Sequence, residues 1–244
     1  MRAAAVAAQT RVELALTLRR GESLLLTLGI PVGLLVFFSL VSVLPLPAGV
    51  SEPVDFLAPG ILALAVMSTA MVSLAIATGF ERQYGVLKRL GSTPLGRPAL
   101  LAAKTLAVVV IEVLQVAVLV AVAVVLGWRP QGSPVLAAGA MVLATVGFAG
   151  LGLLMAGALR AEVTLAAANG LYLVLLLLGG MVFPLERLPA TLEALAGLLP
   201  SAALTEALDA SLSTNATLPA SAVAVLAAWA VTAPALAAWR FRWE

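Results

Sequence analysis

The chain has 244 residues, of which 62% are hydrophobic and only 11% are charged. A soluble domain needs a polar shell and about 25% charged residues, so this composition excludes a soluble fold and places the excess apolar surface against lipid. The net charge is only +2. The basic residues are spread over several loops without interleaved aromatics, so we attribute this charge to membrane topology and not to nucleic-acid binding.

Six continuously apolar runs are long enough to cross a hydrocarbon core of about 30 Å as helices, which requires roughly 20 residues each. The predicted spans are Leu24–Leu46, Leu57–Phe80, Ala99–Leu126, Val135–Leu159, Val163–Phe183 and Ala220–Trp239. Barrel strands alternate in polarity and run for only about ten residues, so they fit these runs poorly. The sequence therefore predicts an all-α integral membrane protein with six transmembrane helices in a single domain, residues 23–244.

Orientation follows from the positive-inside rule. Of the fourteen Lys and Arg residues, twelve fall on one side of this topology and two, Arg129 and Arg187, on the other. The twelve are Arg2, Arg11, Arg19, Arg20, Arg82, Lys88, Arg89, Arg97, Lys104, Arg160, Arg240 and Arg242. We therefore expect both termini to be cytoplasmic and the protein to lie in the plasma membrane.

Residues 1–22 are predicted to form an amphipathic helix at the cytoplasmic membrane surface. Leu14 and Leu18 lie opposite a polar face of Arg2, Gln9, Glu13 and Arg20. A simple basic flank of the first span is the alternative interpretation.

The first span contains Gly29 and Gly33, which are four residues apart. Small residues at this spacing allow close helix approach, so they are candidate dimer contacts. The alternative is a chance pair, because such pairs are frequent in apolar sequences.

The second loop, between predicted spans two and three, is the most polar cytoplasmic stretch. Residues 81–94 of this loop include Glu81, Arg82, Gly85, Lys88 and Arg89. A short helix is expected to stop near Gly91, and the next helix to begin with Thr93 as N-cap and Pro94 as its first residue. Membrane anchoring alone does not require so many charged residues.

Three polar residues inside the spans are candidates for a translocation pathway: Glu112, Gln115 and Asn169. A carboxylate within the membrane is costly and suggests a pathway or a partner. For Glu112 the alternative is a protonated side chain that hydrogen-bonds a neighbouring helix. Asn169 is more simply explained as structural.

The largest outer loop, residues 184–219, has leucines at helical spacing on both sides of Pro200. These stretches are too short to span a bilayer. They predict two short helices in or near the outer leaflet, between the fifth and sixth spans.

Several chemistries are excluded. The chain has no His and no Cys, which removes Ser-His hydrolysis, His-based zinc sites and thiolate chemistry. Residues 96–105 superficially resemble a phosphate-binding loop ending in Lys104 and Thr105, but Pro98 and Ala103 stand where glycines are required. We therefore expect neither a metal nor ATP to bind this chain.

Three stretches resemble the transmembrane subunits of type-2 ATP-binding-cassette (ABC) exporters, a family that includes daunorubicin-resistance-type drug permeases and polysaccharide exporters. They are residues 56–61 (FLAPGI), residues 81–95 of the second loop, and residues 183–189 (FPLERLP) followed by Leu199-Pro200 and Glu206-Ala207-Leu208. Together they extend over essentially the whole chain.

The resemblance implies a bacterial exporter permease without its own ATPase site. It implies pairing with a second copy or a paralogue, and docking of two ATPase subunits that bind ATP and magnesium. Residues 81–94, with Glu81, Arg82, Gly85, Lys88, Arg89, Thr93 and Pro94, would meet the ATPase, and we call them the coupling segment. An amphiphilic substrate such as a drug or lipid fits the apolar spans. The alternatives are an ion-gradient-driven transporter or channel that uses Glu112, and a membrane scaffold.

Overall fold

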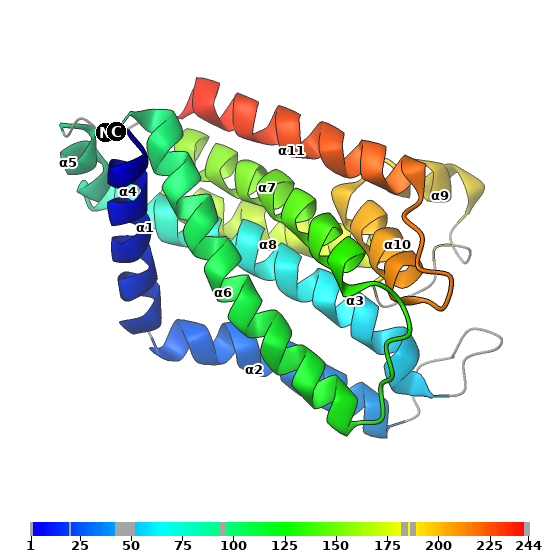
Figure 1. Cartoon of the computed structure of the whole chain (residues 1–244). Coiled ribbons are helices and arrows are strands. Elements are labelled where there is room, and N and C mark those ends of the chain that lie inside the picture. The colour runs from blue at the N-terminus through cyan, green and yellow to red at the C-terminus, as the bar shows by residue number, and fades with distance from the viewer. Residues whose placement is uncertain are drawn as a thin grey trace.

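The computed structural model describes residues 2–19, 21–41, 52–92, 96–181, 185 and 189–241. The regular elements in these ranges are all helical (Figure 1). They are α1 (Arg2–Arg19), α2 (Gly21–Leu40), α3 (Pro53–Met67), the π-helix η1 (Ser68–Ser73), α4 (Leu74–Gln83), α5 (Val86–Gly91), α6 (Arg97–Val125), α7 (Pro134–Ala158), α8 (Ala161–Leu178), α9 (Ala190–Ala196), α10 (Pro200–Leu212) and α11 (Ala220–Arg240).

The predicted all-α membrane architecture is confirmed. Five helical stretches of the described chain are long and apolar enough to cross a bilayer: Pro53–Gln83, Arg97–Val125, Pro134–Ala158, Ala161–Leu178 and Ala220–Arg240. They coincide with predicted spans two to six to within a few residues. The first predicted span corresponds to α2, whose apolar part is the shorter stretch Thr27–Leu40. The remainder of that predicted span, residues 42–46, lies outside the described residues.

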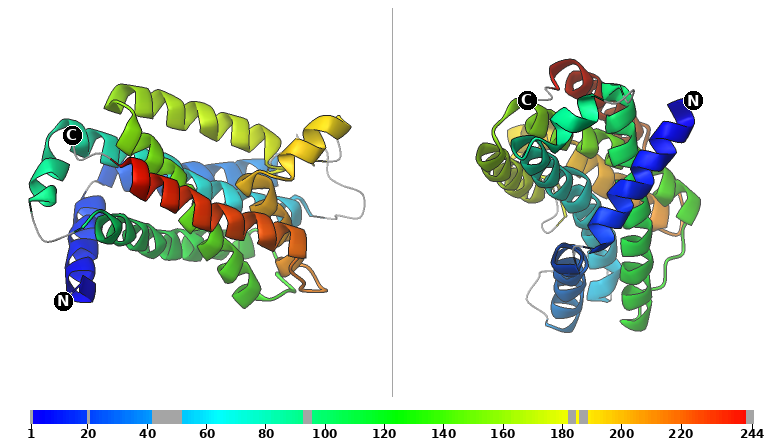
Figure 2. Two further views of the ribbon diagram at one scale, coloured as in Figure 1. Left: turned by 90° about the horizontal axis from the view of Figure 1, so that it is seen from above. Right: turned by 90° about the vertical axis from the view of Figure 1, so that its left-hand side faces the viewer.

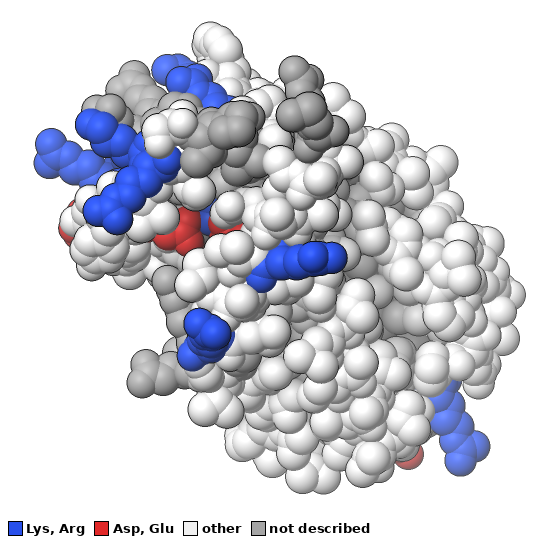
Figure 3. All heavy atoms as spheres, turned by 60° about the vertical axis from the view of Figure 1, so that its left-hand side comes forward, with Lys and Arg blue, Asp and Glu red and all other residues white. Residues whose placement is uncertain are grey.

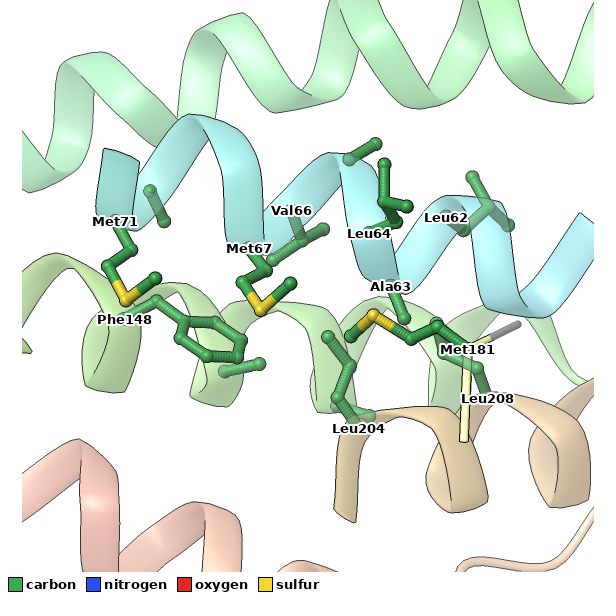
Figure 4. Close-up of a cluster of buried hydrophobic side chains, with 14 of the residues drawn as sticks. Leu62, Ala63, Leu64, Val66, Met67, Met71, Phe148, Met181, Leu204 and Leu208 are labelled. Carbon is green, nitrogen blue, oxygen red and sulfur yellow. The ribbon is translucent and has the colours of Figure 1, made fainter. Parts of the chain in front are cut away.

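The second span forms the centre of the bundle. Its helices α3, η1 and α4 follow one another without a break, and most of α3 is buried. Met67 and Met71 pack with Phe148 of α7, while Leu204 and Leu208 of α10 close the other side of the cluster (Figure 4). Burial on all sides explains why this run is apolar without a polar face.

Glycines on two faces of α7 bring this helix very close to its neighbours. A Cβ added to Gly150 would lie 2.5 Å from the backbone nitrogen of Pro234 in α11. A Cβ on Gly152 would lie 2.6 Å from the carbonyl oxygen of Met71 in η1. Both distances are shorter than van der Waals contact, so α7 can occupy this position only because these residues have no side chain.

The N-terminal helix runs crosswise to the spans. Figure 1 shows α1 turning sharply into α2 and crossing one end of the bundle. That end also carries α5 and both ends of the chain, whereas α9 and α10 lie at the opposite end (Figures 1 and 2). Exposed Arg11 and Arg19 of α1, together with Lys88 and Arg89 of α5, give this end the basic surface visible in Figure 3.

The two short helices predicted between the fifth and sixth spans are confirmed as α9 and α10, separated near Pro200. Helix α10 is more deeply packed than a helix lying on a membrane surface, with Leu204 and Leu208 fully buried. The helix that follows the second loop does not begin at the predicted position, with Thr93 as N-cap and Pro94 as its first residue. Helix α6 begins at Arg97 after an extended Gly96, and Pro98 fits its first turn because proline needs no hydrogen-bond acceptor there.

Candidate functional site

A buried ion triad connects three helices at the basic end of the bundle. Lys104 of α6 places its Nζ 3.0 Å from Glu13 Oε2 of α1 and 2.6 Å from Glu81 Oε2 of α4. The lysine side chain is 1% exposed, and the two glutamates are 12% and 14% exposed. A charge removed from water to this extent requires compensating partners, and here the two carboxylates supply them.

The triad holds the crosswise helix against the spans. The Glu13 carboxylate also accepts a hydrogen bond from Gln9 Nε2 through its second oxygen at 2.8 Å. One turn away, the Thr10 hydroxyl donates to the Ala103 carbonyl at 3.3 Å. The polar side of α1 therefore faces the protein, while Val12, Leu16 and Leu18 point outward and are 44–51% exposed.

Sequence reasoning missed this triad, although one signal was available. Lys104 lies inside the predicted third span, where an unpaired lysine would be costly. It entered the sequence analysis only as a marker of topology and as the lysine of the rejected phosphate-loop match. Glu13 and Glu81 are 91 and 23 positions away in sequence. No local pattern therefore indicates that the three residues meet.

Arg82 of the coupling segment faces inward. Its guanidinium donates to the carbonyl oxygens of Gly157, at 2.7 Å, and of Leu159. These carbonyls lie at the C-terminal end of α7, where the last groups of a helix have no intrahelical donor. Arg82 and Glu81 thus connect the end of α4 to α7 and α6.

The outward part of the coupling segment is α5. Gly85 has a φ of 72°, a left-handed conformation that favours glycine, and it turns the chain from α4 into α5. Leu87 anchors α5 in the core with no exposure, and Lys88 and Arg89 are exposed. The predicted stop near Gly91 is confirmed. Thr93 and Pro94 lie outside the described residues.

Glu112 belongs to α6, and its side chain lies against α7; the residue is 6% exposed. Its Oε2 accepts a hydrogen bond from the Thr145 hydroxyl at 2.5 Å. Its Oε1 is buried and has no hydrogen-bond partner among the described residues. The hydrogen bond to Thr145 of α7 fits the structural alternative for Glu112, and a role of this residue on a pathway stays a prediction.

We expect Glu112→Gln to preserve assembly and transport, because the amide keeps the shape of the side chain and its oxygen still accepts from Thr145. Glu112→Ala should lower the free energy of unfolding by about 1–3 kcal/mol, because it removes buried packing as well as the hydrogen bond. Thermal unfolding and transport by the reconstituted complex measure the two effects. Loss of transport in a well-folded Glu112→Gln variant would instead place this carboxyl on the pathway.

The other two pathway candidates occupy different environments. Gln115 is fully buried; its Nε2 donates to the Thr27 carbonyl of α2 at 2.8 Å, and its Oε1 accepts from Thr69 of η1 at 3.0 Å. It therefore connects three helices. Asn169 is exposed on α8 and donates to the Leu165 carbonyl of its own helix. The structure does not bring Asn169 together with the other two.

The two dimer-contact candidates lie on an open surface of α2. A Cβ added to Gly29 or Gly33 would meet no atom of this chain within 4 Å. Ile30 and Phe37, on the same helix, are each 53% exposed. Glycines of α7, which the sequence analysis did not single out, are among those that do make close contacts with neighbouring helices of this chain.

Comparison with known proteins agrees with this architecture. The family model of the ABC-2 type transporter matches residues 5–212, from α1 to the end of α10. A search of curated proteins found no match.

Proposed function

Since the chain belongs to the ABC-2 type transporter family, we propose that it is the membrane-spanning permease subunit of an exporter powered by separate ATPase subunits. Members of this family form the transmembrane part of ABC transporters, partner with ATPase subunits and usually dimerise. The proposed assembly contains two copies of this chain, or one copy and a paralogue, above two ATPases. ATP and magnesium bind the ATPase subunits.

The observation that carries this proposal is the construction of the coupling segment. Helix α5 presents exposed Lys88 and Arg89 beyond the end of the central span, while Glu81 and Arg82 fix that span end to α6 and α7. A movement imposed on α5 is therefore passed to the bundle through ion pairs and helix-end contacts. Membrane anchoring alone does not explain such an arrangement.

Two further observations support separate ATPase subunits and a symmetric partner. Lys104, the lysine of the superficial phosphate-loop match, is buried in the triad and cannot reach a nucleotide. Gly29 and Gly33 leave an open, small-residue surface on α2 on which a second copy can pack closely. In this proposal the end with α1 and α5 is cytoplasmic, and the membrane is a bacterial plasma membrane.

The test uses the two outward charges of α5. Lys88→Ala combined with Arg89→Ala should leave the chain folded and inserted, because both side chains are exposed. It should weaken co-purification of the ATPase subunit at least tenfold, equivalent to about 1.4 kcal/mol, and abolish ATP-dependent transport. Affinity purification from native membranes, followed by transport in liposomes, measures both effects.

Arg129→Ala is the matched control, because Arg129 is an exposed arginine near the opposite end of the bundle. It should leave ATPase binding unchanged. The double variant is a cleaner test than one that also removes Glu81 and Arg82, whose loss would disturb the fold. Normal ATPase binding and transport by the Lys88/Arg89 variant would refute the coupling assignment.

A further inference from the structure

A groove of about 660 Å³ opens between α1, α2, α4 and α6. Its volume lies within the range of about 300–1,000 Å³ typical of small-molecule sites. Apolar side chains form most of its wall, including Ile76, Phe80, Val108 and Ile111. The ion triad of Glu13, Glu81 and Lys104 forms its polar end. Acidic and basic atoms are recessed in a hollow in Figure 3.

The charge at this end is unbalanced. Two carboxylates share one lysine, and these are the only charged residues among the described residues that line the groove, so the described lining carries a formal charge of −1. Glu13 uses its second oxygen for Gln9, whereas the hydrogen bond from Lys104 occupies only Oε2 of Glu81. In a partly desolvated site an uncompensated negative charge attracts cations and repels anions.

The π-helix η1 borders the same groove. Thr69 at its first turn and exposed Ser73 at its end both line the wall. A π-helical turn inside a long helix is rare and is found frequently at functional sites. Here it interrupts the central span beside the groove.

We propose that this groove binds an amphiphilic cation. The apolar body of the ligand lies against Phe80, Val108 and Ile111, and its cationic group lies at Glu81 Oε1. The assignment of this ligand as cargo rests on the proposed function. The binding site itself does not depend on the ATPase.

The experiment measures binding of rhodamine 6G, a lipophilic cation, to the purified full chain in phosphatidylcholine nanodiscs, with protein-free nanodiscs subtracted. Ala77→Trp places a large side chain in the groove wall and should weaken binding at least tenfold. The matched control is Ala117→Trp, the same substitution on an exposed position of α6 outside the groove, and it should leave binding unchanged. Ser73→Trp obstructs the same groove from an exposed position. It is used in place of Ala77→Trp if that variant does not fold.

The charge preference is tested by competition. Tetraphenylphosphonium should displace rhodamine 6G, whereas tetraphenylborate, an anion of nearly the same size and shape, should not. Equal competition by the two ions would overturn the proposal, as would unchanged affinity in the folded tryptophan variants of the groove. Binding that behaves as expected, without ATP-dependent transport by the assembled complex, would refute the proposed function alone. Transport without groove-dependent binding would refute this inference alone.

Discussion

Lys104→Met is expected to destabilise the protein by about 3–5 kcal/mol, because it leaves two partly buried carboxylates facing each other without their shared cation. Methionine has a volume similar to that of lysine, so the loss of stability measures the missing charge compensation and not a change in packing. Helix α1 should separate from α6, since Lys104 provides its buried ion pair to the spans. Thermal unfolding in detergent measures the stability, and limited proteolysis measures the release of α1.

The matched control is Lys88→Met, the same substitution at an exposed lysine, which should change stability by no more than about 0.5 kcal/mol. Adding Glu13→Gln and Glu81→Gln to Lys104→Met should recover part of the loss, because the carboxylate repulsion disappears. A Lys104→Met protein as stable as the wild type would show that the triad contributes nothing to the fold.

Gly150→Val should produce the second large effect, a loss of about 3 kcal/mol or more in the free energy of unfolding. The new Cβ would lie 2.5 Å from the nitrogen of Pro234 and 2.7 Å from the carbonyl carbon of Ala233. Both are backbone atoms, so relief requires α7 and α11 to move apart along their contact. Thermal unfolding and the yield of monodisperse protein measure the damage.

Gly139→Val is the control within the same helix. Gly139 is exposed, and an added Cβ there meets no atom within 4 Å. The substitution should be nearly neutral, which separates the loss of close packing at Gly150 from any general effect of valine in α7. Comparable destabilisation by the two variants would contradict the close-packing argument.

The coupling segment illustrates how far local sequence reasoning extends. The charges, Gly85 and the stop at Gly91 identify a short structured element between two spans, and α5 confirms it. The sequence did not predict which of its charged residues face the bundle and which face outward. Glu81 and Arg82 face the bundle, whereas Lys88 and Arg89 face outward, because α4 ends against α6 and α7 and Gly85 then redirects the chain.

The glycines also show that local sequence patterns do not predict which helices come into contact. The Gly29 and Gly33 pair fits a known helix-contact pattern, yet it lies on an open surface of this chain. Gly147, Gly150 and Gly157 fall on one face of α7 and approach Trp229, Pro234 and Phe241. Spacing identifies a face on which a helix can approach closely, but it does not identify the helix that occupies it.

The sequence by itself determined the membrane class, the number and approximate limits of the apolar helices and the two short helices between the last two spans. These properties are local, because bilayer thickness sets the length of each apolar run and the polar, proline-containing stretches between the runs separate the helices. Only the tertiary structure decided that Glu13, Lys104 and Glu81 meet, that α10 packs into the bundle and that η1 borders a groove. Those features depend on which helix faces come together, and in lipid many apolar faces are nearly equivalent until close packing and buried charges select among them.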